Sequence, residues 1–221
     1  MADLIATMNS NAAFACISTS GIALFLSGQT SFQLDVTSAG PIPISVWRVR
    51  CLVNRAGSSA LSSILSADET NLFAKECEVI IGRSIAAQAS LASSPAGPGG
   101  VANPPQYLDP VLNKLTDNSR AISLQTVVRI MGGRSGLGVS WQIFFVQLGG
   151  FDTHDNQTPQ HSRLPTQLGE ALEYFDTAMT TAGLNSQVTT FCVGFWQDAD
   201  GKLGRERITA GGAITLLRGA P

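Results

Sequence analysis

The sequence predicts an α/β fold in which a parallel sheet lies between helices, with a β-hairpin region near the N-terminus. Two observations support this prediction. The run Trp141–Leu148 (WQIFFVQL) is apolar at both alternating sets of positions, which is typical of a central parallel strand that helices bury on both faces. An amphipathic helix and the β-prone run Gln187–Phe191 follow it. Strand, helix and strand in this order indicate a βαβ unit.

The sequence pattern of the N-terminal region predicts short strands. Three β-prone runs, separated by Ser-Gly pairs, are Phe14–Ser18, Ile22–Leu26 and Ser31–Val36. Two tight hairpins would connect them.

Three helices are expected after this region. Ser66 and Glu69 have capping-box spacing ahead of the first, whose apolar stripe is Leu72, Phe73, Val79 and Ile80. The second spans about Asn118 to Met131 and ends at Gly132 and Gly133; its stripe is Leu124, Val127, Val128 and Met131. The third spans about Arg163 to Ala182 with Gly183 as C-cap; its stripe is Leu164, Leu168, Leu172, Phe175 and Met179. The Pro- and Gly-rich segment Ser93–Pro105 predicts an exposed loop between parts of one helical layer.

Composition limits the classes of function. A chain of 221 residues with net charge −2 fits one globular domain and offers no electrostatic footprint for nucleic acid. None of the four cysteines forms a CxxC pair, so buried free thiols are expected rather than a zinc ribbon. No apolar run is long enough for a membrane span. The N-terminus has no secretory signal, which predicts a cytoplasmic chain or a targeting segment upstream of it.

The stretch IFFVQLGGFDTHDNQ carries the candidate site. Asp152 and His154 follow the predicted central strand, and ligands of open α/β sheets bind beyond the carboxyl ends of strands. Gly149 and Gly150 let the backbone turn there and approach a ligand closely. A carboxylate and an imidazole two residues apart can face one divalent ion, zinc or similar. Such a metal activates water or polarises a phosphoryl oxygen.

The alternative is a polar loop in which Asp152 builds a turn and His154 is exposed. A catalytic zinc needs at least three protein ligands, and only two are evident. His161, the other histidine, fits a surface or capping role, whereas Asp155, Asn156 and Gln157 fit either a supporting shell or the same loop. GxSxG, P-loop and GxGxxG motifs are all missing.

The motif GGFDTHDNQ, the helix containing LGEALEYF and the run VTTF together resemble the bacterial domain of unknown function 1501 family (DUF1501). GRSIAAQA, FACISTSG and FLSG match its pattern more softly, so the resemblance covers most of residues 14–191. The resemblance implies membership of the alkaline-phosphatase and sulfatase superfamily. It also implies that this chain contains an incomplete form of the parallel sheet of that superfamily. It also implies that Asp152 and His154 are the first ligand pair of a metal site. Any hydrolase activity on phosphate or sulfate esters is then an analogy of fold.

Two departures from the family pattern affect what is expected. Family members usually have a longer N-terminal part, with the first strand, a GGxD-type turn and a twin-arginine export signal. The family is therefore exported to the periplasm, whereas this chain, which lacks those features, would stay in the cytoplasm. After VTTF the family carries SDFGR or SEFGR and later DHGWG or DHG, and neither motif occurs here.

Codon arithmetic offers an explanation for the missing motifs. The residues FCVGFWQDAD can be encoded so that reading from the second base gives SASDFGRTL. The residues RITAGGAITLL can be encoded so that reading from the third base gives DHGWGSHHL. We therefore expect a partial domain over residues 1–191 and an out-of-frame tail over residues 192–221. A genuinely divergent C-terminus is the alternative.

Three functions remain open at this point. The first is a metal-dependent hydrolase-like domain, inactive in this chain because the second ligand pair is missing; its substrate would be an ester or another small molecule. The second is an exported, non-enzymatic binding or assembly protein on the same fold. The third is a non-functional gene fragment. An out-of-frame tail would leave a half-sheet with open edges, and Phe195, Trp196 and the apolar run Ala213–Leu217 could stick to its exposed core.

Overall fold

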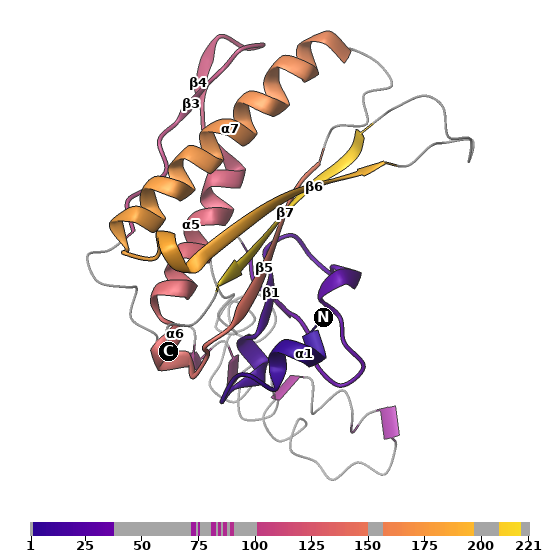
Figure 1. Ribbon diagram of the computed structural model, residues 1–221. Helices are drawn as coiled ribbons and strands as arrows, with labels where there is room; N and C mark the ends of the chain where they lie inside the picture. The colour runs from indigo at the N-terminus through magenta and orange to yellow at the C-terminus, as the bar shows by residue number, and fades with distance from the viewer. Residues whose placement is uncertain are drawn as a thin grey trace, which may run out of the picture. The chain divides into compact units, whose positions relative to one another are not determined.

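The computed structural model describes residues 2–37, 101–149, 157–196 and 208–217, together with scattered helical positions between 72 and 90. The chain divides into two compact units, residues 41–93 and the remainder. The larger unit is a mixed α/β structure (Figure 1). The segment expected to join parts of one helical layer begins at this division, and most of it lies outside the described residues.

The main sheet has five strands in the order β2-β1-β5-β7-β6. Its parallel part consists of β2 (Leu34–Asp35), β1 (Cys16–Ser18) and β5 (Gln142–Leu148). β7 (Ile208–Leu217) is antiparallel to both β5 and β6 (Val188–Trp196). β6 therefore runs in the same direction as β5, with β7 between them. The predicted βαβ order is present, but the two strands of the unit are not neighbours.

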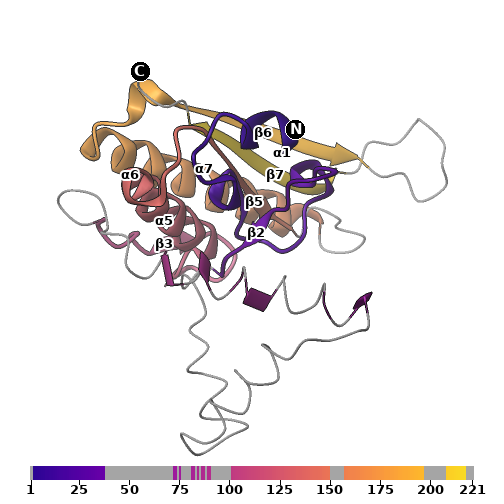
Figure 2. The same cartoon turned by 90° about the horizontal axis from the view of Figure 1, so that it is seen from below.

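Helices α5 (Ser119–Gly132) and α7 (Gln157–Thr181) lie together on one side of the sheet, and α1 (Ala2–Ala6) lies on the other (Figures 1 and 2). α6 (Arg134–Leu137) links α5 to β5. β5 is buried at six of its seven positions, which confirms the prediction of a central strand covered on both faces. On the α1 side the core consists of Ala2, Ala15, Cys16, Ala23, Leu26, Ile143 and Phe145.

The expected N-terminal hairpins are wrong. β1 and β2 pair in parallel, and the middle run forms the 3-10 helix η2 (Leu24–Leu26) instead of a strand. Another 3-10 turn, η1 (Ala12–Phe14), precedes β1. A parallel pair needs a connection of roughly a dozen residues or more, and residues 19–33 supply one. Asp3 fixes this connection, because its carboxylate accepts hydrogen bonds from the amides of Gln29, Thr30 and Ser31 at 2.7–3.1 Å.

Both helices that border the sheet follow the sequence pattern. Asn118 caps α5, and the whole predicted stripe of α5 is buried. In α7, Leu164, Phe175 and Met179 are buried, whereas Leu168 and Leu172 are half-buried at the edge of the packed face. Gly183 ends this helix in the left-handed conformation, with φ of 67°. The first predicted helix falls mostly outside the described residues, and its Leu72 and Phe73 are helical but exposed.

A small hairpin of β3 (Tyr107–Asp109) and β4 (Lys114–Thr116) precedes α5. The predicted loop leads into it, and the described end of that loop is anchored. The carbonyl oxygen of Ala102 accepts hydrogen bonds from Tyr174 Oη at 2.6 Å and Gln125 Nε2 at 3.0 Å. A final 3-10 turn, η3 (Asn185–Gln187), connects α7 to β6. No helix among the described residues is long and apolar enough to cross a membrane.

The cysteine prediction holds at one of the two described positions. Cys16 is a buried free thiol, and its burial raises the pKa to about 11. Cys192 is also free, but it is exposed on β6. Cys51 and Cys77 lie outside the described residues.

Candidate functional site

The carboxyl ends of the parallel strands form the candidate site. β1 and β5 run in the same direction side by side, so Ser18 and Phe145 are neighbours near that edge. β2 adds Asp35 on the other side of β1. β5 ends at Leu148, and Gly149 and Gly150 come next in the sequence, ahead of FDTHD. This is the edge at which open α/β sheets bind ligands.

A hydroxyl-rich turn of residues 18–21 follows β1 at this edge. Its backbone is held against β5, because Thr19 N donates to Phe145 O at 3.0 Å and Gln147 N donates to Ser20 Oγ at 2.9 Å. Gly21 has φ of 84° and donates its amide to Asp35 Oδ1 at 3.2 Å. Thr19 Oγ1 is buried, and we find no hydrogen-bond partner for it within the described ranges. These hydrogen bonds hold the turn in one position beside the carboxyl end of β5.

Asp152 and His154 lie outside the described residues, as do Asp155, Asn156 and Gly150. Their flanks are described: Gly149 follows the end of β5, and α7 begins at Gln157. Gln157 is therefore helical and not part of a polar loop. His161 also lies within α7. In the part of the chain that the structure describes, no group of three or more His, Cys, Asp or Glu side chains could hold a metal ion.

The two long helices α5 and α7 share one direction, and α7 begins ahead of α5. Asn118 Nδ2 donates to Gln167 O at 2.7 Å, and Arg134 Nη2 reaches Gln187 Oε1 at 3.4 Å. α5 and α7 therefore run in the same direction. Figure 1 shows α6, which follows α5, at the end of the sheet where β5 begins. The helix N-termini, which favour negative charge, thus lie towards the carboxyl ends of β1 and β5.

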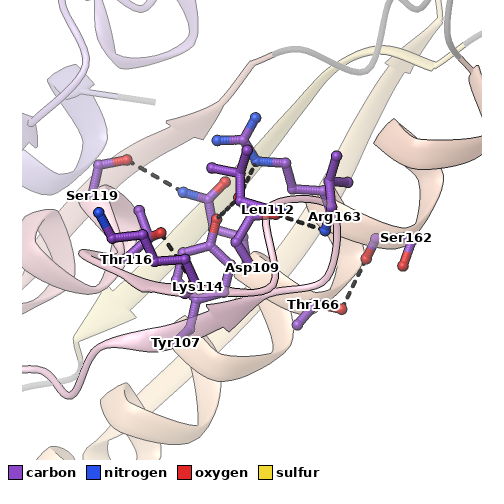
Figure 3. Close-up of polar contacts among 11 residues, drawn as sticks. Tyr107, Asp109, Leu112, Lys114, Thr116, Ser119, Ser162, Arg163 and Thr166 are labelled. Atoms are coloured by element: carbon purple, nitrogen blue, oxygen red, sulfur yellow. Dashed lines mark hydrogen bonds and ion pairs between the residues drawn. The ribbon is translucent and has the colours of Figure 1, made fainter.

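A half-buried ion pair, which sequence reasoning missed, fixes the first turns of α7 to the hairpin (Figure 3). Arg163 Nε lies 2.8 Å from Asp109 Oδ2, and Asp109 is fully buried while the Arg163 side chain is 36% exposed. Tyr107 Oη donates to the same oxygen at 3.3 Å. Asp109 Oδ1 accepts the amides of Val111 and Leu112 at 2.9 and 3.1 Å. Both oxygens of this buried carboxylate therefore have two donors each, and such partners are what a buried charge requires.

The electrostatics of the pair agree with this geometry. Burial acts to raise the pKa of the Asp109 carboxyl, but the amides of Val111 and Leu112, followed by Arg163, outweigh it and hold this pKa below its ordinary value. On the other side, the hydrogen bond with Tyr107 and the charge of Asp109 raise the pKa of Arg163 against the effect of its own desolvation. The pair stays ionised over the physiological range. Its role in the described structure is to position α7.

The turn at Asp109 could have been predicted from the sequence. Asp109 precedes Pro110, and Asp followed by Pro favours turns in which the carboxylate accepts nearby amides. The pairing with Arg163 had no signal in the sequence, because it joins elements that are far apart in the chain.

Comparison with known proteins gives this chain no assigned family: no family model, no curated protein and no solved structure matches it.

Proposed function

We propose that this chain is a partial member of the domain of unknown function 1501 family with an alkaline-phosphatase-like sheet, and that its carboxyl edge is a metal site for phosphate- or sulfate-ester chemistry. The observation that carries the proposal is the position of β5. This buried strand lies beside the carboxyl end of β1 and leads through Gly149 into Asp152 and His154. A metal ion held there would act as a Lewis acid or activate a water molecule.

The proposal also holds that this chain is inactive. Asp152 and His154 provide two ligands, and the family's later DHG motif, which would provide more, does not occur in this sequence. A catalytic zinc site needs three protein ligands and an open position. We therefore expect weak zinc binding and no turnover of phosphate or sulfate esters by the chain as it stands. On this proposal the intact protein is exported.

Zinc titration tests the proposal directly. Equilibrium dialysis of the chain against Zn²⁺ should show weak binding that disappears in Asp152→Asn and in His154→Gln. His161→Gln is the matched control, because it removes the only other histidine and should leave binding unchanged. Equal zinc binding by all four proteins would contradict the proposed ligands. Hydrolysis of aryl phosphate or aryl sulfate esters by the unaltered chain would contradict the proposed inactivity.

A non-enzymatic binding protein is the second candidate, and one observation favours it. The hairpin β3–β4 presents four apolar side chains to solvent, each 46–59% exposed: Leu108, Val111, Leu112 and Leu115. The turn between the strands is held by the buried Asp109, so these side chains are fixed in an outward position. Exposed apolar patches of this kind are typical of protein-binding surfaces. A metal-free but well-folded chain whose two C-terminal motifs had been restored would favour this candidate.

A further inference from the structure

Strand β6 is an outer strand of the main sheet. It pairs with β7 along its whole length and is the last strand in the sheet order. Within the described ranges, no strand pairs with its other side. An outer strand of this kind presents a row of backbone donors and acceptors to which another strand can pair.

Within the part of the chain that the structure describes, the other outer strands are protected against edge pairing and β6 is not. β2 has two residues and ends in Asp35, and β3 and β4 have three residues each, with Lys114 opening β4. Short length and charged side chains are the usual protection against edge-to-edge pairing. β6 has nine residues, VTTFCVGFW, without a charge or a proline. Thr189 and Cys192 on it are exposed, and Phe191 is 49% exposed.

We propose that β6 is a self-association edge, through which two copies of this chain pair antiparallel about a two-fold axis. A second copy is the partner that fits, because a strand without charges pairs with itself without repulsion. Among the described strands, two-fold symmetry uses the unprotected edge of each copy and leaves no other such edge, so assembly stops at the dimer. A strand ladder alone buries less than the roughly 1,200 Å² of a standard interface, so the dimer should be reversible.

The sequence of β6 fixes the register of this pairing. The longest antiparallel ladder pairs the first residue with the last, Val188 with Trp196 of the second copy, and the middle residue of the strand is Cys192. Cys192 of each copy then lies opposite Cys192 of the other. Opposed residues in an antiparallel pair have Cα atoms about 4.5–5.5 Å apart, within the roughly 4.4–6.8 Å that a disulfide spans.

Oxidative cross-linking of the full chain tests both the edge and the register. The azo compound diamide takes two electrons and two protons from a pair of thiols, so the two Cys192 thiols become one disulfide and diamide becomes the hydrazine. We expect a covalent dimer on a non-reducing gel, with the Cys192–Cys192 peptide identified by mass spectrometry. Cys192→Ser should lose it. The double variant Thr190→Cys/Cys192→Ser should also lose it, because residue 190 then faces Gly194 of the second copy.

Sedimentation velocity tests the non-covalent dimer. The reduced chain should shift from monomer to dimer as its concentration rises. Thr189→Lys should abolish this shift, whereas Thr180→Lys, the same change at an exposed position of α7, should not; circular dichroism checks that both variants fold. A chain that stays monomeric at every concentration overturns the proposal. So does growth beyond the dimer, or cross-linking that is as fast from residue 190 as from Cys192.

Discussion

At the residue scale, two carboxylates fix the local structure around the candidate edge. Asp3 ties α1 to the connection between β1 and β2, through the amides of Gln29, Thr30 and Ser31. Asp109 ties the hairpin to α7 through Arg163. In both cases the side chain satisfies backbone amides that a turn leaves without partners, and hydrogen bonds to a charged acceptor are stronger than neutral ones.

Replacing Asp109 by Asn tests the second of these contacts. The amide oxygen can still accept from Val111 and Leu112, but the charge opposite Arg163 is lost and the new NH₂ group faces another donor. We expect the melting temperature to fall by several degrees. Asp117→Asn is the control, because Asp117 is exposed and accepts a hydrogen bond from Gln106 Nε2 at the surface; it should melt like the unaltered chain.

The difference in melting temperature between the unaltered chain and Asp109→Asn should depend on pH. The pKa of Asp109 is lower in the folded chain than its ordinary value, so the contribution of its charge is present at neutral pH and is lost as pH falls through about 4 and below. The difference in melting temperature between the unaltered chain and Asp109→Asn should therefore shrink over this range. A difference that stays constant down to pH 3 would show that Asn disturbs packing instead of charge.

At the element scale, α7 contains Gly169 and is followed by Gly183, and replacing each of these two glycines by alanine should have opposite effects. Gly169 is exposed within the helix, and a Cβ there would meet nothing within 4 Å. Gly169→Ala should add about 0.5–1 kcal/mol to the free energy of unfolding, because alanine loses less backbone entropy in a helix. Gly183 ends the helix with φ of 67°, and Gly183→Ala should cost about 1 kcal/mol because a Cβ is crowded in that conformation.

Urea titration monitored by circular dichroism measures both changes. Each glycine serves as the control for the other, since the chemical change is the same and only the backbone conformation differs. Two changes of the same sign would mean that Gly183 does not hold the left-handed conformation in solution.

The elements that could be predicted from the sequence are those with long, regular patterns. The stripe of α5 and the doubly apolar run of β5 each identify one element, because only one period fits them. The N-terminal runs are too short for this. Ile22–Leu26 fits a strand in sequence, but Leu24 is 88% exposed in a 3-10 turn while Leu26 is buried. Contacts between residues far apart in the sequence, such as those of Asp3, stabilise the parallel crossover instead of a hairpin. Such contacts leave no pattern in the local sequence.

At the scale of the whole molecule, the tail belongs to the main sheet. The expected boundary between residues 191 and 192 lies inside β6, and β7 pairs with β5 from Gln142–Leu217 to Leu148–Gly211. The apolar run Ala213–Leu217 thus covers an edge of β5 that was expected to be open. Backbone pairing is available to any sequence of sufficient β propensity, so a strand at this position does not distinguish a selected tail from an out-of-frame one.

The reading frame of the tail therefore needs a test at the level of the gene. Sequencing the DNA from the codon of Thr190 past that of Pro221 should reveal SDFGR and then DHGWG in the alternative frames. The frame-repaired chain should then bind about one zinc ion, because a second ligand pair completes the three or four ligands of a zinc site. His154→Gln in the repaired chain should lower the zinc affinity by one to two orders of magnitude or more. If the DNA encodes the tail as written and its other frames lack both motifs, the frameshift is wrong. Asp152 and His154 would then have no partners in the tail, and the binding-protein role would be favoured.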